Sequence, residues 1–236
     1  MIPAYNEEHR LPRAFQQIQE YLAARRLDAE VIVVDDGSND GTARVVAEWQ
    51  ATLPSLRLVS NGTNRGKGYS VRHGMLEARG RVALFTDADL SSPIEEADKL
   101  IAALGSYDVA IGSRAVDRSL IAVHQSRLRE LAGICFNKLV QLVTGLPFVD
   151  TQCGFKAFLR ERTRIVFEQQ RTERFGFDPE ILFLAKRHGL HTIEIPVRWA
   201  HDPNTKLHVL RDSVQMFVEL LAIRWNWLLG RYPKKA

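Results

Sequence analysis

Several features that would mark a secreted, disulfide-linked or membrane-spanning protein are missing from the sequence. The 236 residues include only two cysteines, and their spacing matches neither a zinc site nor a redox pair. We expect Cys135 and Cys153 to be reduced thiols, with Cys153 packed as a small apolar side chain. Charges such as Lys138 and Glu219 break the apolar runs, and none reaches the roughly 18 to 20 residues of a membrane span. No signal peptide is visible, so we expect a cytoplasmic protein.

The common nucleotide-binding and nucleic-acid-binding signatures are also missing. The absence of GxGxxG after the first apolar run argues against a dinucleotide fold, and the absence of GxxxxGK[ST] argues against a P-loop. The net charge of +4 is compatible with phosphate-bearing partners. No basic run is interleaved with aromatic residues, so we expect no nucleic-acid partner. A hydrophobic content of 45% predicts a folded protein with a substantial core.

Apolar runs alternate with amphipathic segments along the first half of the chain. A first predicted strand of about three residues follows Met1. The further predicted strands are Ala29–Asp36, Leu56–Ser60, Arg81–Ala88 and Asp108–Arg114. Their hydrophobicity is continuous, which is typical of parallel strands that are buried on both faces. The predicted helices cover residues 11–22, Thr42–Trp49, Tyr69–Arg79 and Pro93–Leu104, the last with Ser91 and Ser92 as its cap. This order predicts a layered α/β fold.

The second half has a different pattern. A stripe at helical spacing predicts a helix through Leu128, Leu131, Cys135, Leu139 and Leu142. Further elements are predicted as a strand within Asp150–Arg160, a helix at Pro179–His188, a strand at His191–Trp199 and a long helix at Lys206–Leu229. Because we find no repeat, low-complexity stretch or linker, we expect a single domain of residues 1–236.

Four of the predicted strands end in polar motifs, which are PAYNEE, DDGS, DAD and GSR. Ligands collect at the carboxyl ends of the strands in an open parallel sheet, so these motifs should share one edge. Asp87 and Asp89 stand one residue apart, which places both carboxylates on one face of an extended strand. Two such carboxylates repel each other unless a cation or proton lies between them, and oxygen ligands suit Mg2+ or Mn2+. The alternative is a pair of exposed turn acids.

Two further motifs admit both a functional and a structural interpretation. Asp35 and Asp36 can accept hydrogen bonds from a nucleobase or a ribose, or they can begin the turn that continues at Gly37. In the segment Asn64–Gly74, Lys67 can neutralise a phosphate and the glycines permit close backbone approach, although a helix-capping turn explains the glycines too.

Taken together and in order, eight motifs resemble those of the family 2 glycosyltransferases: PAYNEE, VVDDGSNDGT, NRGKG, FTDADLSSP, IGSR, DTQCGFKAF, RFGFDPEIL and PVRW. The resemblance covers Ile2 to about Arg224 and is nearest to the polyprenyl- or dolichyl-phosphate glycosyltransferases of the glucosyl type. It implies the GT-A fold, with a mixed, mostly parallel sheet flanked by helices. It also implies a nucleotide-sugar-binding half, residues 1–115, and an acceptor-binding half, residues 116–236, that contains the C-terminal helix.

The resemblance further implies roles for individual residues. Those implied to bind the nucleotide sugar are Pro3, Ala4, Tyr5, Asn6, Glu7, Asp35, Asp36, Gly37, Lys67, Gly68, Asp87, Ala88 and Asp89. The implied metal ligands, for Mg2+ or Mn2+, are Asp87 and Asp89. Those expected at the acceptor phosphate are Arg114, Arg127, Arg129, Lys156 and Lys206, where an R…G…N spacing favours Arg129 with Gly133 and Asn137 over Arg127. The implied catalytic residues are Asp89, Asp178, Arg114 and Arg129, although Asp178 can equally cap a helix before Pro179.

The implied reaction is an inverting, metal-dependent transfer of a hexose, with UDP-glucose as the expected donor and a polyprenyl or dolichyl phosphate as the acceptor. A lipid monophosphate is already mostly dianionic at neutral pH, so it needs cations rather than a strong base. The stretch from Arg114 to Lys138 supplies five Lys and Arg residues against two acids. The alternatives are mannosyl transfer from GDP-mannose, transfer to a hydroxyl acceptor, and a catalytically silent module that binds nucleotide sugars.

A lipid acceptor would place the protein at the cytoplasmic face of a membrane, as a peripheral protein. The last predicted helix carries an apolar stripe of Val214, Phe217, Leu221, Trp225 and Leu228. Tryptophan and lysine residues beside such a stripe are typical of a helix that lies in a membrane interface. Packing of the stripe into the core is the alternative.

Overall fold

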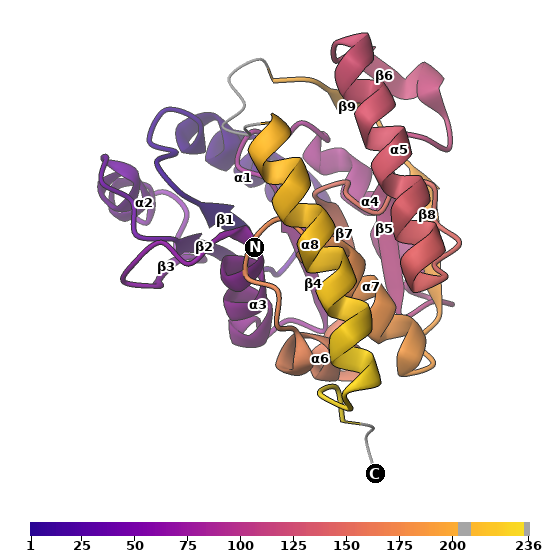
Figure 1. Ribbon diagram of the computed structural model, residues 1–236. Coiled ribbons are helices and arrows are strands. Elements are labelled where there is room, and N and C mark those ends of the chain that lie inside the picture. The colour runs from indigo at the N-terminus through magenta and orange to yellow at the C-terminus, as the bar shows by residue number, and fades with distance from the viewer. Residues whose placement is uncertain (203–208, 234–236) are drawn as a thin grey trace.

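The computed structural model describes residues 1–202 and 209–233, apart from the side chains of residues 127–128 and 209–213 (Figure 1). Three parallel strands form one sheet in the order β1 (Ile2–Ala4), β2 (Val31–Asp35) and β3 (Leu56–Ser60). Four more strands pair in the order β4 (Val82–Thr86), β7 (Phe155–Leu159), β5 (Val109–Ser113) and β8 (Thr192–Pro196). The two sheets meet where the Thr86 N–H of β4 donates to the Met1 carbonyl at 3.0 Å.

The strand β7 is the exception to parallel pairing. It comes from the second half of the chain and pairs antiparallel with both β4 and β5, whereas β5 and β8 pair in parallel. Three of the five pairings in these two sheets are parallel, so the two sheets taken together are mixed and mostly parallel. A small third sheet pairs β6 (Ile121–Val123) with β9 (Trp199–Ala200) at the rim.

Helices cover both faces of the sheets and create two separate cores. One core packs against α1 (Leu11–Arg25), α2 (Thr42–Trp49) and α4 (Ala97–Ala103), which follows the short helix η1 (Ile94–Glu96). The other packs against α3 (Lys67–Glu77), α6 (Arg160–Gln169), α7 (Phe177–Arg187) and α8 (Val209–Leu228). Successive residues of β2 alternate between these cores, which explains why its sequence is continuously apolar.

Most predicted elements are confirmed, and several boundaries needed correction. The strand β3 and the helix α2 have their predicted bounds, and β1 has three residues. The helix α3 begins at Lys67, two residues early, while α6 and β6 were not predicted. The expected capping by Ser91 and Ser92 is wrong, because Pro93 occupies the N-cap position and no side chain caps that helix.

The helices α5 (Arg127–Thr144) and α8 lie side by side on one surface, where both expose apolar residues (Figure 1). Leu220 and Ile223 of α8 are each 1% exposed, whereas Trp225 and Leu228 are 61% and 65% exposed. The exposed members of the α8 stripe are Val214, Phe217, Leu221, Trp225 and Leu228. Packing of this stripe into the core, the alternative interpretation, is therefore wrong. Among the described residues, no helix combines the length and apolar character needed to cross a membrane.

Candidate active site

The turns after β1 and β2 form one hydrogen-bonded unit at the carboxyl edge of the first sheet. The Asp36 N–H donates to the Ala4 carbonyl at 2.8 Å, and the Asn6 N–H donates to Ser38 Oγ at 2.9 Å. In return, Asn6 Oδ1 accepts from the Asn39 N–H at 2.8 Å. These bonds hold the PAYNEE and DDGS motifs together, as their positions at strand ends predict.

Asp36 organises a neighbouring turn. Its carboxylate is 4% exposed and accepts from the Arg65 and Gly66 backbone N–H groups at 2.9 and 2.8 Å. It also accepts from Asn61 Nδ2 at 2.8 Å. The buried carboxylate therefore holds the turn that leads to Lys67, and the contact of Asp36 with a nucleotide stays a prediction. Asp35 remains a predicted nucleotide ligand.

Gly37 is required by the same arrangement of turns. Its φ of +74° lies in the left-handed region, and an added Cβ would stand 2.7 Å from the Asn64 backbone nitrogen. A side chain at this position would push the Asn64–Gly68 turn away from the end of β2.

The helix α3 and the strand β4 bring a cation and two carboxylates together. Lys67 Nζ lies 2.5 Å from Asp87 Oδ1, and the Ser91 N–H donates to Asp89 Oδ1 at 2.9 Å. Burial, followed by the charge of Asp87, raises the pKa of Asp89. Burial lowers the pKa of Lys67, but the carboxylates of Asp87 and Asp178 outweigh it, so that pKa is raised overall.

Gly154 admits Asp87 to this position. An added Cβ at Gly154 would stand 2.2 Å from Asp87 Oδ2, so no other residue fits there without movement of the acid. No local pattern in the sequence indicates that Gly154 and Asp87 are neighbours, because β7 reaches β4 only through the antiparallel pairing.

The two carboxylates suit a divalent cation that is shared with a substrate. Within residues 1–202 and 209–233, no three His, Cys, Asp or Glu side chains are grouped closely enough to hold a metal alone. Mg2+ usually binds proteins through one or two carboxylates and completes its shell with water and substrate phosphates. The raised pKa of Asp89 reflects a buried acid beside another acid, which is the setting that a bound cation stabilises.

Three arginines that follow β5 in the chain line the same pocket. Arg114 forms a two-point contact with Asp150, at 2.7 Å from Nε to Oδ2 and 2.8 Å from Nη2 to Oδ1. Arg118 pairs with Glu130. No carboxylate in the described part of the chain pairs with Arg129, which leaves its guanidinium for an external anion. Asp150 was missed, since it lies 36 residues from Arg114 in sequence and no motif spacing links the two.

Lys156 and Asp178 form a buried pair beneath the site. Lys156 is fully buried, and its Nζ donates to the Cys153 carbonyl at 2.6 Å and to Asp178 Oδ1 at 2.5 Å. The prediction that Lys156 binds the acceptor phosphate is therefore wrong. Asp178 does not cap α7, because Gly176 is the N-cap residue. Burial raises the pKa of Asp178 against the opposing charges of Lys156 and Lys67.

A single pocket of about 380 Å3 joins these groups. Its lining brings together six predicted residues: Lys67, Asp87, Asp89, Arg114, Arg129 and Asp178. The predicted Gly133 and Asn137 also line it, and Asn137 Nδ2 donates to the Phe148 carbonyl at 2.9 Å. Among the described residues, the lining does not include the base-binding candidates of β1 and β2, namely Pro3, Ala4, Tyr5, Asn6, Glu7, Asp35, Asp36 and Gly37. Lys206 and the side chain of Arg127 lie outside the described residues.

Comparisons with known proteins agree with this geometry. The family model described as "Glycosyl transferase family 2" matches residues 1–165. The dolichyl-phosphate beta-glucosyltransferase of Drosophila melanogaster is 37% identical, over 98% of this chain and 76% of its own. The enzyme of the same name from Dictyostelium discoideum is 35% identical, over 100% of this chain and 76% of its own.

Solved structures share the fold at lower identity. Mannosyl-3-phosphoglycerate synthase from Rubrobacter xylanophilus gives a TM-score of 0.66 at 20% identity, over 100% of this chain and 75% of its own. Glucosyl-3-phosphoglycerate synthase from Mycobacterium tuberculosis, solved with Mn2+, UDP and glucosyl-3-phosphoglycerate, gives 0.64 at 18% identity, over 100% of this chain and 79% of its own. The predicted GT-A fold is thereby confirmed.

Proposed function

Because the chain belongs to glycosyl transferase family 2, we propose that this glycosyltransferase moves glucose from UDP-glucose to a polyprenyl or dolichyl phosphate. The observation that carries the proposal is the pocket in which Asp87 and Asp89 face Arg114 and Arg129. Acids for a metal-bound donor and cations for an anionic acceptor are both needed for such a transfer. The names of the relatives that are 35–37% identical support the choice of sugar and acceptor.

On the donor side, we place the diphosphate of UDP-glucose beside Lys67, Asp87 and Asp89. A Mg2+ or Mn2+ ion held there would neutralise the negative charge that builds on the leaving diphosphate. Lys67 adds a fixed positive charge, and its salt bridge with Asp87 at 2.5 Å keeps the ammonium in place. Asp36 supports this arrangement indirectly, because it holds the turn before Lys67.

On the acceptor side, we place the phosphate against Arg129, with Arg114 next to it. Arg114 is oriented by Asp150 at two points, so it presents a preorganised cation. A dianionic phosphate is already a competent nucleophile, so no base is needed to take a proton from it. Asp178 is engaged by Lys156 at 2.5 Å, which favours a role in orienting the site over a role as a base.

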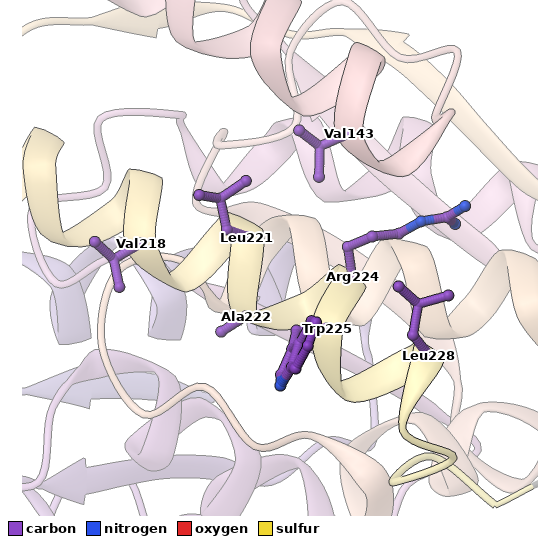
Figure 2. Close-up of a pocket in the computed structure, with 7 residues that line it drawn as sticks. All are labelled: Val143, Val218, Leu221, Ala222, Arg224, Trp225 and Leu228. Atoms are coloured by element: carbon purple, nitrogen blue, oxygen red, sulfur yellow. The ribbon is translucent and has the colours of Figure 1, made fainter.

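We also propose that the protein is peripheral to a membrane, with α8 and the neighbouring end of α5 on the bilayer. Figure 2 shows Leu221, Arg224 and Leu228 of α8 on the side that faces Val143 of α5, while Trp225 points to the other side of the helix. These residues line an open groove of about 680 Å3. Exposed leucine, tryptophan and arginine side chains on one helix suit the interface between lipid headgroups and acyl chains.

The test is incubation with UDP-glucose or GDP-mannose and a polyprenyl phosphate, with Mn2+ or with EDTA. We expect a glucolipid from UDP-glucose that depends on the metal. In Arg129→Gln we expect KM for the lipid phosphate to rise by roughly 10- to 100-fold, the value of a charge-assisted hydrogen bond. Arg164→Gln, on the far helix α6 where Arg164 pairs with Glu168, is the matched control. A mannolipid from GDP-mannose, or turnover with a hydroxyl acceptor alone, would contradict the proposal.

A further inference from the structure

The segment between α6 and α7 packs against the start of α3, the helix that begins with Lys67. The Tyr69 N–H of α3 donates to the Glu173 carbonyl at 2.9 Å. A Cβ added at Gly68 would stand 2.6 Å from the Thr172 carbonyl oxygen, so a side chain there would push the two segments apart. The first turn of α3 is therefore held by a segment that lies about 100 residues further along the chain.

Gln170 secures this contact with a buried amide. The residue is 4% exposed, and its Nε2 donates to the Gly68 carbonyl at 2.8 Å and to the Thr172 carbonyl at 3.0 Å. Among the residues that the structure describes, Gln170 Oε1 has no hydrogen-bond partner although it is buried. Because a buried oxygen without a partner lowers stability, the gain in stability alone does not account for an amide at this position.

A buried acid of α7 fixes the segment that carries Gln170. Glu180 is fully buried, and its carboxylate accepts from the Thr172 N–H at 2.7 Å and from the Arg171 N–H at 3.1 Å. The hydroxyl of Tyr232, which follows α8, donates to Glu180 Oε1 at 2.5 Å. The segment is thus anchored on the side away from α3, so the amide of Gln170 is a fixed point for the first turn of that helix.

We propose that Gln170 is a positioning residue for the donor site, which fixes the first turn of α3 and thereby sets the position of Lys67. This inference rests on the proposed function, in which the diphosphate of UDP-glucose lies beside Lys67. Gly68 adjoins Lys67 in the chain, and Lys67 Nζ lies 2.5 Å from Asp87 Oδ1 in the pocket. Loss of the bond to the Gly68 carbonyl would let the turn and its ammonium group shift. The acceptor phosphate is placed against Arg129, on a different helix, so donor binding should weaken and acceptor binding should not.

The experiment compares Gln170→Met with Gln19→Met. Methionine is an unbranched side chain of similar length that lacks the amide donor. Gln19 of α1 is the matched control, because its Nε2 also donates to a backbone carbonyl, that of Thr52 at 2.7 Å, and it does not line the pocket. Titration calorimetry with UDP and Mn2+ measures donor binding without turnover, and initial rates give the two KM values.

We expect Gln170→Met to raise the Kd for UDP and the KM for UDP-glucose by about tenfold, a magnitude typical of residues that orient a binding group. The KM for the lipid phosphate and the midpoint of urea unfolding should stay near wild type, and Gln19→Met should leave all four values unchanged. As a second variant, Gln170→Glu at pH 8 places a carboxylate against two carbonyl oxygens. It should raise the Kd for UDP at least as much.

A wild-type Kd for UDP in a folded Gln170→Met or Gln170→Glu protein, as circular dichroism would show, overturns the inference. A lower unfolding midpoint with no change in donor binding would likewise reduce Gln170 to a structural residue. The proposed function fails in a different way, since the wild-type protein itself would then form no glucolipid from UDP-glucose. Glucolipid synthesis by the wild type, combined with unaffected variants, would refute the positioning role alone.

Discussion

The helices α1 and α8 carry similar apolar stripes in sequence, yet they have opposite surroundings. Leu11, Phe15 and Ile18 of α1 are at most 5% exposed, whereas Trp225 and Leu228 of α8 are 61% and 65% exposed. A helical period shows that a helix has an apolar face, but it does not show what covers that face. On α1 the cover is the sheet; on α8 a second apolar face already packs inward, so the predicted stripe is left on the surface.

The largest effect should come from a paired test of these two stripes. Phe15→Ala should lower the free energy of unfolding by about 3–5 kcal/mol, because it leaves a cavity in a packed core. Trp225→Ala should change it by no more than about 0.5 kcal/mol, because the indole is mostly in solvent. Urea unfolding of both variants gives the comparison. Equal losses would mean that the Trp225 face is covered in solution, for instance by a second copy of the chain.

A second, smaller effect compares Arg114, which pairs with a carboxylate, with Arg129, which has no such partner among the described residues. Asp150→Asn should cost about 2 kcal/mol of stability, since it leaves Arg114 without its two-point partner. Burial alone would raise the pKa of the Asp150 carboxyl. The Arg114 guanidinium outweighs burial and holds that pKa below its ordinary 3.8. The contribution is therefore present above pH 3.8 and is lost as the pH falls through the lower folded value.

Urea unfolding of wild type and Asp150→Asn across a pH series measures this difference. The difference in the free energy of unfolding between the two proteins should stay constant from neutral pH down to pH 3.8 and then decrease at lower pH. Arg129→Gln, which breaks no ion pair among the described residues, should leave stability near that of wild type. A loss of stability in Arg129→Gln that matches that of Asp150→Asn would show that Arg129 also has a structural partner.

The smallest effect compares the chemical modification of the two cysteines, one on the surface and one in the core. Cys135 on α5 is exposed, while burial raises the pKa of the Cys153 thiol to about 11. Iodoacetamide at about pH 8 should therefore modify Cys135 alone in the folded protein and both residues after denaturation, as mass spectrometry would show. Rapid modification of Cys153 would indicate that the core around this buried thiol opens.

Features set by neighbouring residues could be predicted from the sequence, and features set by distant ones could not. The bounds of α2 and β3 follow from local patterns. The meeting of Asp87 and Asp89 with Arg114 in one pocket follows from the rule for strand ends. The burial of Lys156 depends on Asp178, 22 residues away, and on an antiparallel strand that local pattern does not reveal. The backbone donors that bind Asp36 could not be predicted either, because they belong to a turn 29 and 30 residues further along the chain.

The position of β7 has a consequence for how the protein is made. The strand β7, residues 155–159, lies between β4 and β5 in the sheet. These two earlier strands therefore lack their shared partner until the ribosome has released β7. A nascent chain would carry open apolar edges at both strands for much of its synthesis, and such edges invite aggregation. Non-local pairing of this kind also slows folding. Chains truncated before Phe155 should therefore need chaperones and should not yield a soluble half.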